Sequence, residues 1–347
     1  MKPSVSIIIP VYGSEPYIRE CLESVAGQDY GGALECLLID DCGPDRSAEI
    51  AAEFIKSYRG AVAFRLMRQS SNLGSSVARN RALEEARGDY VLFVDADDKL
   101  FPHSLSALCS HVMSHPGVDL VLGDLTDSNP SMIHPRYPRD YFEGDECKRL
   151  LLAGNFQHGP RNKLIRRKLI EDVGLRFPPG FFAQDYIFKF YLAKHIRTMA
   201  LDYTGTYFYR TDNPLSVSVG ASRLKQIADV LRADNTLITD LDSVDLGAQL
   251  YYLFYELFFI ESDIRCSKYP DATERRQLLD ELRNVNRRLS QAIPCHLPAL
   301  KSASKLLDMI IRLNPSGNSR PYWLSRGVVN RLLKYVQKSI LNLSPSH

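Results

Sequence analysis

Three short apolar runs lie near the start of the chain, and each ends abruptly in polar residues. The runs are Val5–Ile9, Leu34–Ile39 and Tyr90–Val94. Each is followed by a segment in which apolar residues recur at helical spacing. These segments are Glu15–Ala26, Ala48–Tyr58 and Ser75–Arg87. Strands that alternate with helices of this length predict an α/β fold with a parallel, doubly wound sheet.

The third apolar run is followed at once by a cluster of acids, Asp95, Asp97 and Asp98. Two carboxylates about 4 Å apart repel by roughly 4 kcal/mol at an effective dielectric constant near 20. A cation normally offsets such repulsion, and the hard ions Mg²⁺ and Mn²⁺ prefer oxygen ligands. We therefore favour a metal or ligand site over the alternative, a polar turn after a strand.

The other two runs also end in residues that suit a binding site. Leu34–Ile39 leads into Asp40 and Asp41, and the first run leads into Pro10-Val-Tyr12. In open α/β sheets, ligands bind in the crevice at the carboxyl ends of the strands. We expect the ring of Tyr12 to stack on a base there, because base–aromatic stacking contributes roughly 1–3 kcal/mol.

Five motifs in order resemble those of the inverting family 2 glycosyltransferases, of the type that builds bacterial surface polysaccharides. They are Ser6–Tyr12, Ile39–Asp41, Asn72–Asn80, Gly88–Asp98 and the pair Asn162–Leu164 with Gln184–Phe188. Together they span residues 4 to about 220. The resemblance implies the GT-A fold, which is Rossmann-like with a mainly parallel sheet flanked by helices. No motif of the family is recognised in residues 221–347.

The resemblance also implies a role for individual residues. The nucleotide-binding positions are Pro10, Val11, Tyr12, Asp41, Asn72, Arg79, Asp95 and Ala96. Asp41 would accept the imino N–H of uracil, and Arg79 would pair with Asp41 or reach the nucleotide. The metal ligands would be Asp97 and Asp95, with Mn²⁺ or Mg²⁺ as the cofactor. Asp185 would be the general base, unless it only caps the helix that follows it.

The chain departs from the family pattern in two places near these residues. The family usually has Glu-Asp at the position of the base, whereas this chain has Gln184-Asp185. The base is kept and the neighbouring charge is lost. Gly13 follows Tyr12 where the family often has Asn. Further on, Tyr207–Arg210 with Ser216–Ser218 resembles a family segment that closes over the donor.

Length and composition agree with an enzyme of two parts. The chain has 347 residues, which suits an α/β domain at 1–220 and a helical carboxyl-terminal extension at 221–347. The formal net charge of +2 argues against bulk binding of nucleic acid. Residues 301–347 are nevertheless basic, with eight Lys and Arg against one acid. The seven cysteines are scattered, which favours free thiols in a reducing compartment.

A basic amphipathic helix is predicted at about 322–341. Its apolar residues fall on one side at 100° per residue, and Arg326, Arg331, Lys334 and Lys338 fill the other side. Such helices suit the interface of an anionic bilayer. The alternative is that the apolar side packs on the helices at 222–313. The sequence shows no signal peptide and no spanning segment, so we expect a cytoplasmic enzyme on the inner face of the cell membrane.

The sequence thus predicts a metal-dependent glycosyltransferase that moves a hexosyl or N-acetylhexosaminyl group. The donor would be a UDP-sugar, the acceptor a glycan or lipid-linked molecule, and the anomeric configuration would be inverted. One alternative is a transferase-like binding protein that is catalytically impaired. It is suggested by Gln184, which stands where the family usually has an acid. Another is a haloacid-dehalogenase-like phosphatase, which also carries Asp-x-Asp after a strand, but near its amino end.

Overall fold

The computed structural model describes most of the chain. The described residues are 1–127, 136–154, 156–211, 213, 223–243, 245–266, 272–313, 331, 333–338 and 340–341. The strands of the main sheet are β1 (Val5–Val11), β2 (Leu34–Asp40), β3 (Ala63–Arg68), β4 (Tyr90–Phe93), β6 (Leu120–Leu122), β8 (Tyr141–Glu143), β9 (Lys163–Arg166) and β10 (Thr198–Leu201). They run in the order β3-β2-β1-β4-β9-β6-β10-β8.

The predicted parallel sheet is confirmed in its amino-terminal half. Strands β1, β2, β3 and β4 are parallel, and β10 is parallel to β6. Strand β9 runs antiparallel between β4 and β6, and β8 runs antiparallel at the edge beside β10. The sheet is therefore mixed, because the chain returns through β9 between two strands of the opposite direction.

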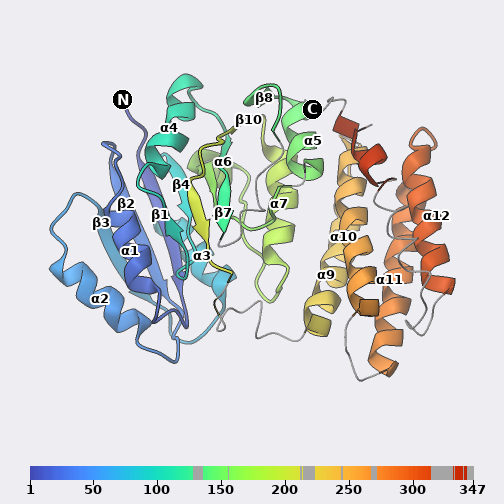
Figure 1. Ribbon diagram of the computed structural model, residues 1–347, viewed down its shortest axis with the longest axis horizontal. Coiled ribbons are helices and arrows are strands. Elements are labelled where there is room, and N and C mark those ends of the chain that lie inside the picture. Colours follow the sequence, from blue (N-terminus) through green and yellow to red (C-terminus); the bar gives the residue numbers. More distant parts are fainter. Residues whose placement is uncertain are drawn as a thin grey trace.

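Helices cover both faces of this sheet (Figure 1). They are α1 (Ile18–Ala26), α2 (Ser47–Ser57), α3 (Ser75–Glu85), α4 (Ser104–Ser114), α5 (Asp145–Ala153), α6 (Arg167–Asp172) and α7 (Gln184–His195). Successive residues of β1 point to opposite faces, so that Ile7 and Ile9 join one core and Ile8 joins the other. This burial on both sides explains why the strands read as continuous apolar runs rather than as alternating ones.

A second, smaller sheet lies next to the acids that follow β4. It consists of β5 (Lys99–Leu100), β11 (Tyr207–Tyr209) and β7 (Leu125–Asp127), in the order β5-β11-β7. Strand β11 pairs antiparallel with β5 and parallel with β7. It thereby brings residues near 207–213 to the cluster at 95–98, although more than one hundred positions of sequence separate them.

The carboxyl-terminal part is helical, as predicted. It consists of α9 (Arg223–Leu237), the short 3₁₀ helix η1 (Ile238–Asp240), α10 (Leu246–Cys266), α11 (Ala272–Ala292) and α12 (Pro298–Leu313). The apolar segment at 246–260 forms most of α10 and is largely buried, also as predicted. Figure 1 shows α9 to α12 standing together at one end of the molecule, opposite α1 and α2.

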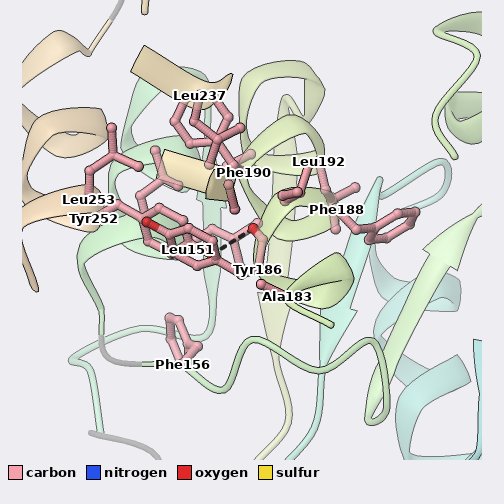
Figure 2. Close-up of a cluster of buried hydrophobic side chains, with 14 of the residues drawn as sticks. Leu151, Phe156, Ala183, Tyr186, Phe188, Phe190, Leu192, Leu237, Tyr252 and Leu253 are labelled. Carbon is pink, nitrogen blue, oxygen red and sulfur yellow. Dashed lines mark hydrogen bonds between the residues drawn. The ribbon is translucent and has the colours of Figure 1, made fainter. Parts of the chain in front are cut away.

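This helical extension shares one continuous apolar core with the α/β domain. Figure 2 shows Tyr186 and Phe190 of α7 beside Tyr252 and Leu253 of α10, with Leu237 of α9 nearby. The rings of Tyr186 and Tyr252 stack with centroids 4.6 Å apart. The hydroxyl of Tyr252 also donates a hydrogen bond to the backbone oxygen of Tyr186 at 2.9 Å. The described helices α7 and α10 thus meet in a packed interface.

The described part of the predicted basic helix packs on the protein. Leu333, Val336 and Leu341 are buried in the shared core, and the side-chain amide of Gln337 donates to the backbone oxygen of Ala153. These apolar side chains are therefore not available to enter a bilayer, which corrects the expectation for this half of the helix. The opposite side, with Arg331, Lys334, Tyr335 and Lys338, is exposed. Residues 314–330 lie outside the described residues.

No helix in the described part of the chain is both long enough and apolar enough to cross a membrane. The six described cysteines are free thiols, as expected, and four of them are buried.

Candidate active site

The three predicted strand ends meet at one edge of the main sheet. Strand β1 lies between β2 and β4, and Val11 pairs in register with Asp40 while Ile8 pairs with Phe93. Because these strands are parallel, their carboxyl ends open into the same crevice. Tyr12 and Asp41 directly follow β1 and β2, and Asp95 follows β4 after Val94, so the structure brings together the residues that the sequence singled out.

The first strand end presents an aromatic side chain to solvent. Tyr12 is 43% exposed, which is unusual for a large apolar ring in this chain. Pro10 beside it is half-buried. Val11 and Ala96 are buried as whole residues, so this structure offers little of either residue to a ligand. Stacking of a base on the exposed ring of Tyr12 remains a prediction.

Asp41 holds the loop that precedes α3. Its carboxylate accepts hydrogen bonds from the backbone N–H groups of Leu73 at 2.7 Å and Gly74 at 2.9 Å, and from the side chain of Gln69. Asn72 is exposed on this loop, and its side-chain oxygen accepts a bond from Gly74 N at 3.2 Å. A carboxylate offers about four acceptor positions, so these three bonds leave one unused, although Asp41 is only 3% exposed. Its contact with a nucleotide base remains a prediction.

Asp95 is paired with two arginines of the protein itself. Its two oxygens lie 2.9 Å from Arg79 Nη2 and 3.0 Å from Arg161 Nη1. Burial by itself raises the pKa of Asp95, but the two guanidinium groups outweigh it and hold that pKa below its ordinary value. Arg79 therefore pairs with Asp95, and the expectation that it pairs with Asp41 is wrong.

The second terminal nitrogen of Arg79 contacts the predicted base. Arg79 Nη1 lies 3.2 Å from Asp185 Oδ1, and the arginine side chain is only 6% exposed. One buried guanidinium thus joins an acid at the end of β4 to the acid at the start of α7. Asp185 stands in the first turn of α7, where a negative side chain is favoured by the helix dipole. The N-cap of α7 is Ala183 and no side chain caps the helix, so the alternative that Asp185 caps it is wrong. Its role as the base remains a prediction.

Asp97 is the more open of the remaining acids. Asn213 donates to its Oδ2 at 2.7 Å, and Arg210 Nε donates to its backbone oxygen at 2.8 Å. Burial and the nearby Asp95 raise its pKa. A cation beside this carboxylate would stabilise its ionised form, which burial and Asp95 disfavour.

Asp98 has a structural environment. It is almost fully buried, and it accepts hydrogen bonds from the hydroxyl of Tyr207 at 2.7 Å and the backbone N–H of Arg210 at 2.8 Å. Burial, with Asp95 and Asp97 nearby, raises its pKa to about 8. Asp98 therefore fastens β11 to the acidic turn, and of the three acids Asp97 is the one with a carboxylate oxygen that no described residue bonds.

The described residues contain no group of three or more His, Cys, Asp or Glu side chains that could hold a metal ion. A site with one or two carboxylates nevertheless fits Mg²⁺ or Mn²⁺ when substrate phosphates supply the other ligands. Within the described part of the chain one oxygen of Asp97 has no hydrogen-bond partner, whereas both oxygens of Asp95 contact arginines. The residues present therefore fit a metal held chiefly by Asp97 and completed by a diphosphate.

Sequence reasoning missed Arg161 and Asn213 and gave Arg210 only a weak role. Arg161 lies just before β9, and its guanidinium also stands 4.0 Å from the centre of the Tyr209 ring. No spacing in the sequence relates Arg161 to Asp95, because the contact depends on the antiparallel insertion of β9 beside β4. For Arg210 the family-like segment at 207–210 was the available signal, whereas Ser216–Ser218 lie outside the described residues.

Together the mixed sheet and the acids that follow its strands match the arrangement expected of the GT-A fold. The family model described as glycosyl transferase family 2 matches residues 6–174. An N-acetylglucosaminyltransferase of Bradyrhizobium elkanii is 34% identical over 128 residues, which are 37% of this chain and 69% of that protein. The chain belongs to glycosyl transferase family 2, which excludes the phosphatase alternative.

Other relatives cover more of the chain. EpsH of Bacillus subtilis, named as a glycosyltransferase, is 30% identical over 223 residues, or 60% of this chain. The chain spans only 61% of the length of EpsH. The crystal structure of Staphylococcus aureus TarS 1-349 in complex with UDP-GlcNAc superposes with a TM-score of 0.71 at 21% identity, and covers 97% of this chain and 91% of that one. This likeness confirms the GT-A fold and extends over the helical region.

Proposed function

We propose that the protein transfers a sugar from a UDP-linked donor to a hydroxyl of a glycan or lipid-linked acceptor, with inversion and with a divalent metal. The observation that carries this proposal is the link from Asp95 through Arg79 to Asp185. It sets an acid suited to the donor and a candidate base on the two sides of one crevice. An inverting displacement needs such a base and no nucleophile from the protein, by analogy with inverting glycosidases.

In this proposal, different residues at the strand ends bind different parts of the donor. Tyr12 offers a ring to the base, and Asp41 keeps an acceptor position for its imino N–H. Asp97 would hold the metal, which when bound neutralises the diphosphate and acts as a Lewis acid on the leaving group. Arg79 and Arg161 keep Asp95 ionised and fixed in direction. UDP is favoured as the nucleotide because TarS, a relative of the same fold, is described in complex with UDP-GlcNAc.

Asp185 would take the proton from the acceptor hydroxyl as the new glycosidic bond forms. The acceptor must then approach α7 on the side away from the diphosphate. TarS is named a poly(ribitol-phosphate) β-N-acetylglucosaminyltransferase and is 28% identical to this chain over 210 residues. That relationship favours a polymer of the bacterial cell surface as the acceptor and N-acetylglucosamine as one sugar to test.

We also place the enzyme on the cytoplasmic face of the membrane. The support is the exposed side of the predicted basic helix, of which residues 331, 333–338 and 340–341 are described and which is called the last helix below. There Arg331, Lys334 and Lys338 accompany Tyr335, which is 66% exposed. Because the apolar side of this helix is packed on the protein, such binding would be electrostatic rather than by insertion.

The decisive experiment is transfer from UDP-GlcNAc to poly(ribitol phosphate) with Mn²⁺, measured as the release of UDP that depends on the acceptor. A ligand at 100 times its dissociation constant should stabilise the folded protein by roughly 2.7 kcal/mol, so thermal shifts can rank other UDP-sugars beside it. We expect turnover that EDTA abolishes, and an Asp97→Ala protein that has lost both turnover and the effect of Mn²⁺ on UDP affinity.

The matched control is Asp172→Ala, which removes an exposed acid on α6 that pairs with Lys168. This variant should keep full turnover. Binding of UDP-sugars without turnover of any of them would instead support the binding-protein alternative. Full activity in EDTA would remove the metal from the proposal.

A further inference from the structure

The side-chain amide of Gln184 lies between two hydroxyl groups of another helix. Its nitrogen donates to Ser75 Oγ, and its oxygen accepts from Ser76 Oγ. Both serines stand in the first turn of α3, whereas Gln184 is the first residue of α7. More than one hundred positions separate the partners in sequence, so these bonds fasten the starts of two helices to each other.

The same side of α3 holds the segment that leads to the base. Asn80 donates to the backbone oxygen of Phe177 at 2.8 Å and accepts from its backbone N–H at 2.9 Å. Ser76 Oγ also lies 3.1 Å from the backbone oxygen of Pro178. Residues 76, 79 and 80 share a helix face because they are three and four positions apart. One face of α3 thus contacts the chain from 177 to 185, including Asp185.

The start of α3 also contacts the part of the site where the donor is expected to bind. Helix α3 begins after Gly74, whose φ of +87° suits glycine, and Asp41 accepts the N–H of Gly74 at 2.9 Å. Contacts therefore run without a break from Asp41 through the start of α3 to Gln184 and Asp185. The loop expected to meet the nucleotide and the residue expected to meet the acceptor share one support.

An amide suits this position better than a carboxylate would. The amide donates to Ser75 and accepts from Ser76, whereas a carboxylate would accept from both hydroxyls and carry a charge. A carboxylate at 184 would also add a second negative charge beside Asp185, whose arginine partner Arg79 already contacts Asp95.

We propose that Gln184 is a positioning residue that aims Asp185 at the acceptor and adds no second charge next to it in the first turn of α7. The Asp229 carboxylate of α9 also lies at this helix start, where it accepts from the Ala183 N–H at 2.9 Å and pairs with Arg232. This inference rests on the proposed role of Asp185 as the base.

The test compares Gln184→Ala, Gln184→Glu and the double variant Ser75→Ala/Ser76→Ala with the wild-type chain, using the acceptor-dependent release of UDP from UDP-GlcNAc with Mn²⁺. A displaced base costs up to about a hundredfold in rate, so we expect kcat of Gln184→Ala to fall roughly tenfold to a hundredfold while KM for UDP-GlcNAc stays within about twofold. The serine variant should lose as much, and combining it with Gln184→Ala should add little, since both remove the same contact. Gln277→Ala, an exposed glutamine on α11, is the control.

Gln184→Glu separates positioning from simple support of the fold. It keeps an acceptor for Ser76, so kcat should recover at alkaline pH, while the acid limb of its pH profile moves to higher pH by about one unit through the added charge. An acid limb in its original place would overturn the proposal. So would a Gln184→Ala protein with unchanged kcat.

A second measurement does not depend on activity. The backbone amide of Ile187, which closes the first turn of α7 by donating to Ala183 O at 3.2 Å, should exchange its hydrogen at least about tenfold faster in Gln184→Ala than in the wild-type or Gln277→Ala proteins. Equal exchange would overturn the inference even if the enzyme is active. The Asp185→Asn protein keeps the two failures apart. If it stays active, the proposed base is wrong; if it is inactive while the Gln184 variants match the wild type, the base stands and the positioning role fails.

Discussion

At the scale of single residues, three acids of the same turn have three different environments. Asp95 is neutralised by Arg79 and Arg161, Asp97 has an oxygen that no described residue bonds, and Asp98 is buried against the hydroxyl of Tyr207. Environment, not residue type, sets the role that each carboxylate can fill. Asp185 differs from all three because it stands on a helix start across the crevice.

The role of Asp185 can be tested by one isosteric change. Asp185→Asn keeps an oxygen that can accept from Arg79 Nη1, so donor affinity should stay within a few-fold of wild type. An amide cannot take a proton, and a lost general base typically costs roughly 10²–10⁴ in rate. Calorimetric titration with UDP and a turnover assay measure the two effects separately. Collapse of donor affinity with a rate near wild type would show that Asp185 is only structural.

At the scale of elements, α7 is the helix on which the site depends most. Its first turn carries Gln184 and Asp185, and its middle is buried against α10 of the helical extension (Figure 2). Lys189 is almost fully buried within it, and its Nζ donates to the backbone oxygen of Phe156 at 2.6 Å. This bond fastens α7 to the loop that carries Arg161. Because Arg79 contacts Asp185 of the same helix, both arginines that pair with Asp95 depend on the position of α7.

The burial of Lys189 predicts a pH dependence of stability. Desolvation, partly opposed by Glu256, lowers the pKa of Lys189 to about 7. Between about pH 7 and pH 10.4 the unfolded chain therefore binds a proton that the folded chain lacks, and stability rises with pH. The unfolding free energy of the wild type should gain about 2 kcal/mol from pH 7 to pH 9 relative to Lys189→Met.

Urea denaturation of the two proteins at pH 7 and pH 9 measures this difference. Using Lys189→Met as the reference cancels the other groups that titrate in this range. An equal change of stability in both proteins would show that Lys189 keeps its proton when folded.

At the scale of the whole molecule, the α/β domain and the helical extension form one body with a continuous core. Described residues of α5, α7, α9, α10 and the last helix all contribute to this core. The last helix packs its apolar side inward and turns its basic side outward. The extension therefore completes the support of α7 and presents a charged surface at the same time.

The charged surface predicts binding to anionic lipid vesicles at low salt. Each basic residue near such a surface contributes about 1 kcal/mol, so the variant Arg331→Glu/Lys334→Glu/Lys338→Glu should lose at least about two orders of magnitude in partitioning. The control is Arg19→Glu/Lys56→Glu/Arg59→Glu, an equal charge change on exposed residues in or next to α1 and α2. Co-sedimentation that is the same for wild type and both variants would remove the membrane surface from the proposal.

The sequence by itself determined the strand ends and the residues directly after them. Tyr12, Asp41 and the acids at 95–98 could be read from the chain because a buried strand and the turn after it are contiguous in sequence. Asp185 could be named from its motif, and the helical nature of 221–347 followed from periodicity. These features are local, so residue spacing carries them.

Only the tertiary structure decided which charges meet. Arg161 reaches Asp95 because β9 inserts antiparallel next to β4, and Arg79 reaches Asp185 because α3 packs against the start of α7. The apolar side of the last helix could face a bilayer or a protein core with the same sequence pattern, and the structure places Leu333 and Val336 in the core. A periodic pattern specifies that a face is buried. The partner that buries it depends on how distant segments pack, which spacing along the chain does not encode.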